Sequence, residues 1–125
     1  MKQAKNIWKR IDVKSLKEWK EDFGTSYKDL GVIDIDFSDD LTLEDLNFLY
    51  WACNKCDCLV VLSENEKVIK FLEHISYVDF IYPSKSLEDF SNVEYPTLYL
   101  ARNKEDVSKE VNESQGFRVD TYEQS

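Results

Sequence analysis

The side chains best suited to chemistry in this sequence are acids that gather in one short stretch. Six acidic residues follow or end a short apolar segment: Asp34, Asp36, Asp39, Asp40, Glu44 and Asp45. In an extended strand, Asp34 and Asp36 would point to the same face, and carboxylate oxygens are the ligands that Mg²⁺ prefers. The pattern predicts a metal site formed by Asp34, Asp36, Asp39 and Asp40. It is also compatible with a solvated acidic loop in which Asp40 or Thr42 caps the next helix.

The charge of the chain suggests a second use for the same acids. The net charge is −9, yet residues 1–20 carry seven basic side chains against two acidic ones, which leaves −14 on the other 105 residues. Such an acidic body repels nucleic-acid phosphates and would suit a basic protein surface. We therefore expect a protein partner, not a nucleic acid. The residues expected to contact it are Asp39, Asp40, Glu44 and Asp45.

The three cysteines and the single histidine invite a zinc or redox interpretation. Zinc needs four ligands, and His74 is the one candidate to join Cys53, Cys56 and Cys58. However, Cys53 falls on a predicted helix and Cys58 opens a predicted buried strand, so their side chains should diverge. Free cysteine is commonly a buried core residue, and we expect that here. His74, near a helix end, would interact with the helix dipole.

Several catalytic and nucleotide-binding signatures cannot be written in this chain. There is no G-x-S-x-G segment for a nucleophilic serine. With only Gly24, Gly31 and Gly116, neither a dinucleotide-binding loop nor a P-loop can be formed. These absences argue against serine hydrolases and common nucleotide-binding classes.

The elements that must position these residues alternate between strand and helix. Apolar runs and periodicity predict five strands, at 32–37, 58–62, 78–82, 97–101 and 117–122, and helices at 41–53, 63–75, 86–90 and 104–114. Alternation of this kind requires a mainly parallel sheet with helices on both faces. We expect a three-layer Rossmann-like α/β fold with an extra N-terminal helix. The chain would be one domain over 1–125, with a basic helical segment at 1–24 and an α/β core at 31–122.

Two predicted helices carry specific expectations about their ends and faces. Thr42 and Asp45 have the spacing of a capping box, and so do Ser63 and Glu66. The apolar face of the first helix is expected to include the following residues: Leu43, Leu46, Leu49, Tyr50 and Cys53.

The sequence offers no membrane or export signal. No apolar run approaches the roughly 20 residues that span a bilayer, and the basic N-terminus lacks the apolar segment of a signal peptide. An odd number of clustered cysteines does not fit a secreted disulfide framework. We expect a cytoplasmic protein without membrane attachment.

Residues 32–122 resemble the cytidylyltransferase-like nucleotidyltransferases. The likeness is carried by a gap-free pattern at Leu49, Ala52, Cys56, Asp57, Leu59, Val60 and Val61, by the step Tyr77-Val78-Asp79, and by the segments YPTLYLARN and GFRVDTY. The family's two histidines, which stabilise the triphosphate, are replaced by Thr42 and Asp45, with Glu44 in place of the glycine between them. The arginine-bearing segment and the closing Ser/Thr-rich motif are also missing. The resemblance therefore implies a non-catalytic relative that acts by binding a macromolecule.

A competing resemblance is to the haloacid-dehalogenase-like phosphatases. Asp34-Ile35-Asp36 looks like their nucleophile and acid/base pair, and Ser63 looks like their phosphoryl-binding serine. Arg102 stands where that family has a metal-binding aspartate. This resemblance implies a Mg²⁺-dependent phosphatase as the alternative function.

A third alternative rests on charge alone. The acids could cover the basic site of an enzyme, as in an inhibitor or immunity-type protein, and complex formation would then depend strongly on salt.

Overall fold

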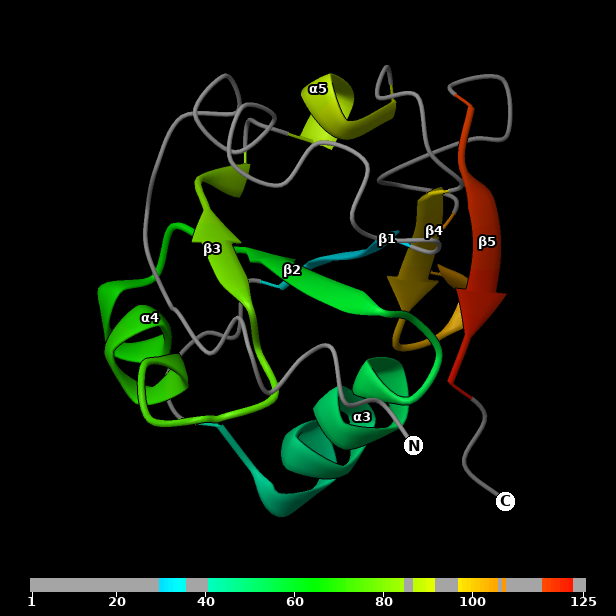
Figure 1. Cartoon of the computed structure of the whole chain (residues 1–125). Coiled ribbons are helices and arrows are strands. Elements are labelled where there is room, and N and C mark those ends of the chain that lie inside the picture. Colours follow the sequence, from blue (N-terminus) through cyan, green and yellow to red (C-terminus); the bar gives the residue numbers. More distant parts are fainter. Residues whose placement is uncertain are drawn as a thin grey trace.

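The computed structural model describes residues 30–35, 41–84, 87–91, 97–105, 107 and 116–122 (Figure 1). The predicted basic helical segment at 1–24, the acidic residues 36–40 and most of the predicted helix at 104–114 lie outside the described residues. The elements are, in chain order, β1 (Leu30–Asp34), α3 (Leu43–Cys53), β2 (Cys58–Leu62), α4 (Glu66–Leu72), β3 (Phe80–Tyr82), α5 (Leu87–Ser91), β4 (Thr97–Ala101) and β5 (Arg118–Thr121).

The five strands form one sheet in the order β3-β2-β1-β4-β5. Every neighbouring pair is parallel. The central strand, β1, pairs with β2 from Leu30 opposite Cys58 to Asp34 opposite Leu62, and with β4 from Leu30 opposite Thr97. The predicted Rossmann-like α/β fold is confirmed.

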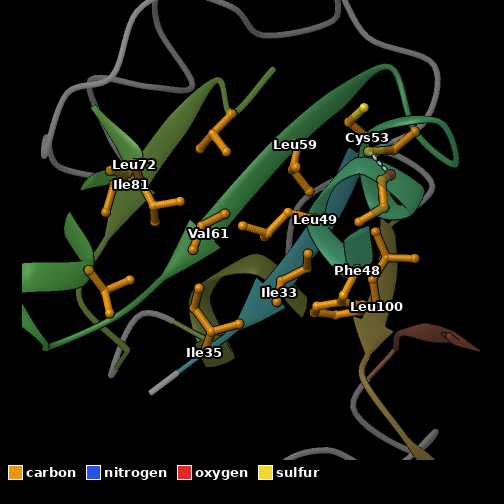
Figure 2. Close-up of a cluster of buried hydrophobic side chains, with 14 residues drawn as sticks. Ile33, Ile35, Phe48, Leu49, Cys53, Leu59, Val61, Leu72, Ile81 and Leu100 are labelled. Carbon is orange, nitrogen blue, oxygen red and sulfur yellow. Dashed lines mark hydrogen bonds between the residues drawn. The ribbon is translucent and has the colours of Figure 1, made fainter. Parts of the chain in front are cut away.

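Helices cover both faces of this sheet, and each face has its own apolar core. On one face, α3 and α4 pack through Phe48, Leu49 and Leu72 against strand residues that include Ile33 and Val61 (Figure 2). On the other face, Leu87 and Phe90 of α5 pack against alternate residues of the same strands. Chain direction explains the division. The crossovers β1-α3-β2 and β2-α4-β3 run one way across the sheet and the crossover β3-α5-β4 runs back, so a constant handedness places their helices on opposite faces.

The first strand begins two residues and ends three residues earlier than its apolar pattern predicts. β1 covers Leu30–Asp34, not 32–37. Gly31 is part of the strand and pairs with both β2 and β4. A glycine is needed here because a Cβ atom would lie 2.5 Å from Cys56 Sγ and 2.9 Å from Leu100 Cδ1.

The third strand is shorter than the predicted 78–82. β3 begins at Phe80 because the preceding residue pairs with β2 partly through its side chain. Asp79 Oδ2 accepts a 2.8 Å hydrogen bond from Leu59 N–H, while Asp79 N–H donates to Leu59 O at 3.0 Å. The strands at 58–62 and 97–101 match their predicted bounds, and β5 lies within the predicted 117–122.

Helix α3 has the predicted capping box, but its buried face differs from the prediction. Thr42 is the N-cap, and Asp45 completes the reciprocal pair. Leu43 and Tyr50, expected on the apolar face, are 75% and 60% exposed. The buried face of the helix is therefore rotated from the predicted one and includes the acid Asp45. The buried residues are Asp45, Phe48, Leu49, Ala52 and Cys53.

Helix α4 begins later than predicted. Its N-cap is Asn65, whose side chain accepts hydrogen bonds from Lys67 N–H and Val68 N–H. The predicted capping box between Ser63 and Glu66 is therefore wrong. Ser63 is buried and lies within the turn that leads from β2 to the cap. In the part of the chain that the structure describes, no helix combines the length and the apolar character needed to cross a bilayer.

Candidate functional site

The sheet order places a topological switch point between β1 and β4. The chain leaves β1 toward α3 and β2 on one side, whereas it leaves β4 toward β5 on the other. Because the two connections diverge, open α/β sheets bind ligands at the carboxyl ends of the two strands that flank such a point. Here these ends carry Asp34 and Arg102.

An ion pair between a buried carboxylate and a partly exposed arginine occupies this position. Asp45, in the first turn of α3, is only 3% exposed. Its Oδ1 atom accepts a hydrogen bond from Nη1 of Arg102, which directly follows β4. Its Oδ2 atom accepts a 2.9 Å hydrogen bond from Thr42 N–H, and Asp45 N–H donates to Thr42 Oγ1 at 3.1 Å. The carboxylate thus pairs with Arg102 and satisfies the backbone N–H of Thr42, while the Thr42 hydroxyl satisfies that of Asp45.

This arrangement decides what the start of α3 can bind. Helix N-termini attract anions through their unpaired N–H groups and the helix dipole. In this chain, the Asp45 carboxylate is itself the anion at the start of the helix. A substrate phosphate placed here would meet a negative charge, and it would have to compete with that charge for Arg102.

A second hydrogen-bonded group joins the carboxyl ends of β1, β2 and β3. Ser84, two residues after β3, donates from its hydroxyl to Asp34 Oδ1 at 2.9 Å. The backbone N–H of the same serine donates to Glu64 Oε2 at 2.9 Å. Ser84 therefore holds carboxylates from the ends of two other strands in fixed positions.

Ser63 follows β2 directly, and its hydroxyl is engaged within the turn. It is 1% exposed, and its Oγ accepts a 3.1 Å hydrogen bond from Asn65 N–H. Its own N–H donates to Tyr82 O at 3.0 Å. The serine therefore tightens the turn before α4.

The structure places the predicted metal and partner residues unevenly. Of the four predicted metal ligands, Asp34 is described and bonds to Ser84, whereas Asp36, Asp39 and Asp40 lie outside the described residues. Among the residues that are described, no group of three or more His, Cys, Asp or Glu side chains could hold a metal ion. The metal site therefore stays a prediction. Of the two other predicted partner contacts, Glu44 is exposed and Asp45 is the buried partner of Arg102.

The interpretation of the cysteines as core residues is confirmed. All three are buried and free of disulfides. Cys53 Sγ donates to Tyr50 O at 3.1 Å, and Cys56 Sγ donates to Ala52 O at 3.4 Å. His74 is exposed, in the turn that follows α4.

Two residues of the site were not assigned from the sequence. The sequence resemblance places Arg102 at a family aspartate but does not pair it with Asp45, and no pattern singles out Ser84. Both residues come just after predicted strands, at 97–101 and 78–82. The carboxyl ends of parallel strands meet at one edge, so a signal for their convergence was present in the sequence.

Comparisons of the chain with protein-family models, with curated proteins and with solved structures give no match. What the fold and the site define is therefore a class: a Rossmann-like α/β protein whose switch point holds a buried, internally paired carboxylate.

Proposed function

We propose that this chain is a non-catalytic, nucleotidyltransferase-like protein that acts by binding a macromolecular partner. The observation that carries the proposal is the Asp45–Arg102 pair at the switch point. In the family that the sequence resembles, this part of the helix start supplies histidines to a triphosphate. Here it supplies a carboxylate that is already bonded to Thr42 and Arg102.

The outer surface of α3 supports the binding role. Leu43 is 75% exposed and stands beside the exposed Glu44. Tyr50, two turns further along, is 60% exposed and lies on the same side of the helix as Leu43. Large apolar side chains on the surface beside acids are typical of interaction sites. A partner with a basic surface that also offers apolar contacts would fit this face.

The test of the missing activity is a titration with nucleotides. We expect CTP, ATP and inorganic phosphate, each with Mg²⁺, to leave the unfolding temperature unchanged and to show no turnover. A ligand at 100 times its Kd would stabilise the fold by about 2.7 kcal/mol. Stabilisation of this size, or a kcat on the order of 1–10³ s⁻¹, would overturn the proposal.

Two matched variants show whether Asp45 is what excludes anions. Asp45→Asn removes the charge but keeps an oxygen that can accept from Thr42 N–H. It should gain stabilisation by phosphate, because the negative charge that opposes an anion beside Arg102 is removed. Glu44→Gln makes the same change of charge on the neighbouring exposed residue and should gain none.

The binding role itself is tested by affinity capture followed by mass spectrometry. The wild-type chain and the variants Glu44→Lys and Asp39→Lys/Asp40→Lys are compared at low and high salt. We expect a protein that the wild type retains at low salt, and that both charge reversal and high salt release. Capture that is indifferent to both would contradict the role of the acids.

One observation favours the phosphatase as a second candidate. Asp34 ends β1, and Ser63 follows the neighbouring β2, so both lie at the same edge of the sheet. Turnover of p-nitrophenyl phosphate by the wild type, abolished in Asp34→Asn, would support this alternative over the non-catalytic role.

A further inference from the structure

Among the described residues, the outer edge of β5 has no paired strand. In the part of the chain that the structure describes, β5 pairs with β4 on one side, and no strand pairs with it on the other (Figure 1). The opposite edge strand, β3, has all three residues buried. In β5, Arg118 is exposed and the other three residues are partly exposed. An accessible edge of this kind is a template for pairing with another strand.

The hydrogen bonds of β5 show which residues face outward. Tyr122 N–H donates to Ala101 O at 2.9 Å, so the backbone of Tyr122 faces β4. The N–H and C=O groups of successive residues alternate between the two sides of a strand. Asp120 and Arg118 therefore also face β4 with their backbone, and Val119 and Thr121 direct theirs to the outer edge.

The side chains of β5 are self-complementary in charge. Arg118 and Asp120 are two residues apart and lie on the same face of the sheet. If a second β5 pairs antiparallel about Val119, Arg118 of each copy lies opposite Asp120 of the other. These two pairs occupy positions without backbone hydrogen bonds, where opposite side chains are closest.

The alignment centred on Asp120 is less favourable. Pairing centred on Asp120 also uses the outward backbone groups, but it places Asp120 opposite Asp120. Like charges directly opposite are destabilising. In the alignment centred on Val119, the outward N–H and C=O groups of Val119 bond to those of Val119 in the second copy. The charges therefore select one of the two alignments.

We propose that this chain forms a two-fold symmetric dimer in which β5 pairs antiparallel with β5 of a second copy. The two five-stranded sheets then form one continuous sheet, through an interface that uses the same residues from both copies. Asp120 also contacts Lys55 of its own chain, with Nζ and Oδ2 3.6 Å apart. In the dimer, each Asp120 lies between this lysine and Arg118 of the second copy. The dimer is independent of the proposed function, because it uses neither the switch point nor the outer face of α3.

The test uses two single variants and their mixture in sedimentation velocity over a concentration series. We expect the wild type to pass from monomer to dimer. Arg118→Asp places aspartates opposite each other, and Asp120→Arg does the same with arginines. Each variant alone should have a dissociation constant raised about tenfold or more, since symmetry applies the change twice. An equimolar mixture of the two should dimerise again, because the charges are then complementary.

A backbone variant separates loss of pairing from loss of folding. Val119→Pro removes an N–H that faces outward, so the ladder between β4 and β5 is kept. It should stay folded by circular dichroism and remain monomeric. Three results would overturn the proposal: a wild type that is monomeric at every concentration, single variants that dimerise like the wild type, or a folded Val119→Pro variant that still dimerises.

Discussion

Two carboxylates that are buried in the described part of the chain, Asp45 and Asp79, show how the same side chain can serve a site or the fold. Asp79 is fully buried at the amino end of β3, and its carboxylate bonds to the backbone of β2. Asp45 is buried near the carboxyl ends of the strands, and its carboxylate bonds to Arg102 and to Thr42 N–H at the start of α3. Asp79 therefore maintains strand pairing, whereas Asp45 determines the charge that a ligand would meet.

The phenol of Tyr77 makes the free energy of unfolding depend on pH in the alkaline range. Burial, followed by the nearby Cys53 and Tyr50, raises the pKa of Tyr77 above its ordinary value of 10.0. The folded state then keeps the phenol proton at pH values where the unfolded chain loses it. This contribution to stability is fully present below pH 10.0 and is lost as the pH rises through the folded-state pKa.

The expected outcome is a steeper loss of stability in the wild type than in Tyr77→Phe above pH 10.0, measured by urea unfolding. Phenylalanine keeps the edge-to-face contact with Tyr50, whose ring centroid lies 5.7 Å away. Because burial is the largest cause, Tyr50→Phe should keep most of the slope. Parallel curves for the wild type and Tyr77→Phe would show that this phenol does not titrate differently in the fold.

At the scale of elements, the contact between β1 and the segment that joins α3 to β2 gives a prediction about Gly31. A Cβ atom at this position would lie 2.5 Å from Cys56 Sγ and 2.9 Å from Cys56 Cβ. Gly31→Ala should therefore lower the free energy of unfolding by about 1–3 kcal/mol, as overpacked cores do.

The matched double variant tests this cause. Cys56→Ala removes the sulfur atom, so Gly31→Ala should cost less in that background than in the wild type. The coupling between the two changes is read from denaturant unfolding of all four proteins. Strictly additive costs would place the origin of the effect elsewhere.

Elements could be predicted from the sequence where the pattern allowed one interpretation. The prediction failed where tertiary packing decided which of two helix faces is buried. β2 and β4 are continuous apolar runs buried on both faces, so their bounds were readable. In α3, Leu43 and Tyr50 fit the helical period as well as the buried residues do. The face that contains Asp45 is buried instead, and Arg102, 57 residues away in sequence, pairs with that acid. Local periodicity contains no information about a partner so distant in sequence.

At the scale of the whole molecule, general rules predicted the type of sheet but not the order of its strands. Alternating elements predicted a parallel sheet with helices on both faces, and the structure has this arrangement. The return of the chain across the sheet between β3 and β4 creates the switch point, and no local pattern marks it. The site could be predicted at the end of β1 but not completed from the end of β4, because completing it requires knowing which strands are neighbours.

The net charge of −9 leads to the last prediction, which concerns salt. An excess of one sign destabilises the compact state through self-repulsion. Raising the ionic strength from about 0.01 M to 0.15 M shortens the Debye length from about 30 Å to about 8 Å. We expect the unfolding temperature to rise by about 3 °C, which corresponds to about 1 kcal/mol for a chain of this size. Calorimetry with sodium, potassium and choline chloride should give the same rise, because screening does not depend on the identity of the cation.

Magnesium chloride at equal ionic strength separates the two interpretations of the acids after β1. The same rise indicates a screened surface, whereas a larger one indicates a bound ion. A fall of the unfolding temperature with salt would show that attraction between opposite charges, as in the pairs Asp45–Arg102 and Lys55–Asp120, outweighs the repulsion.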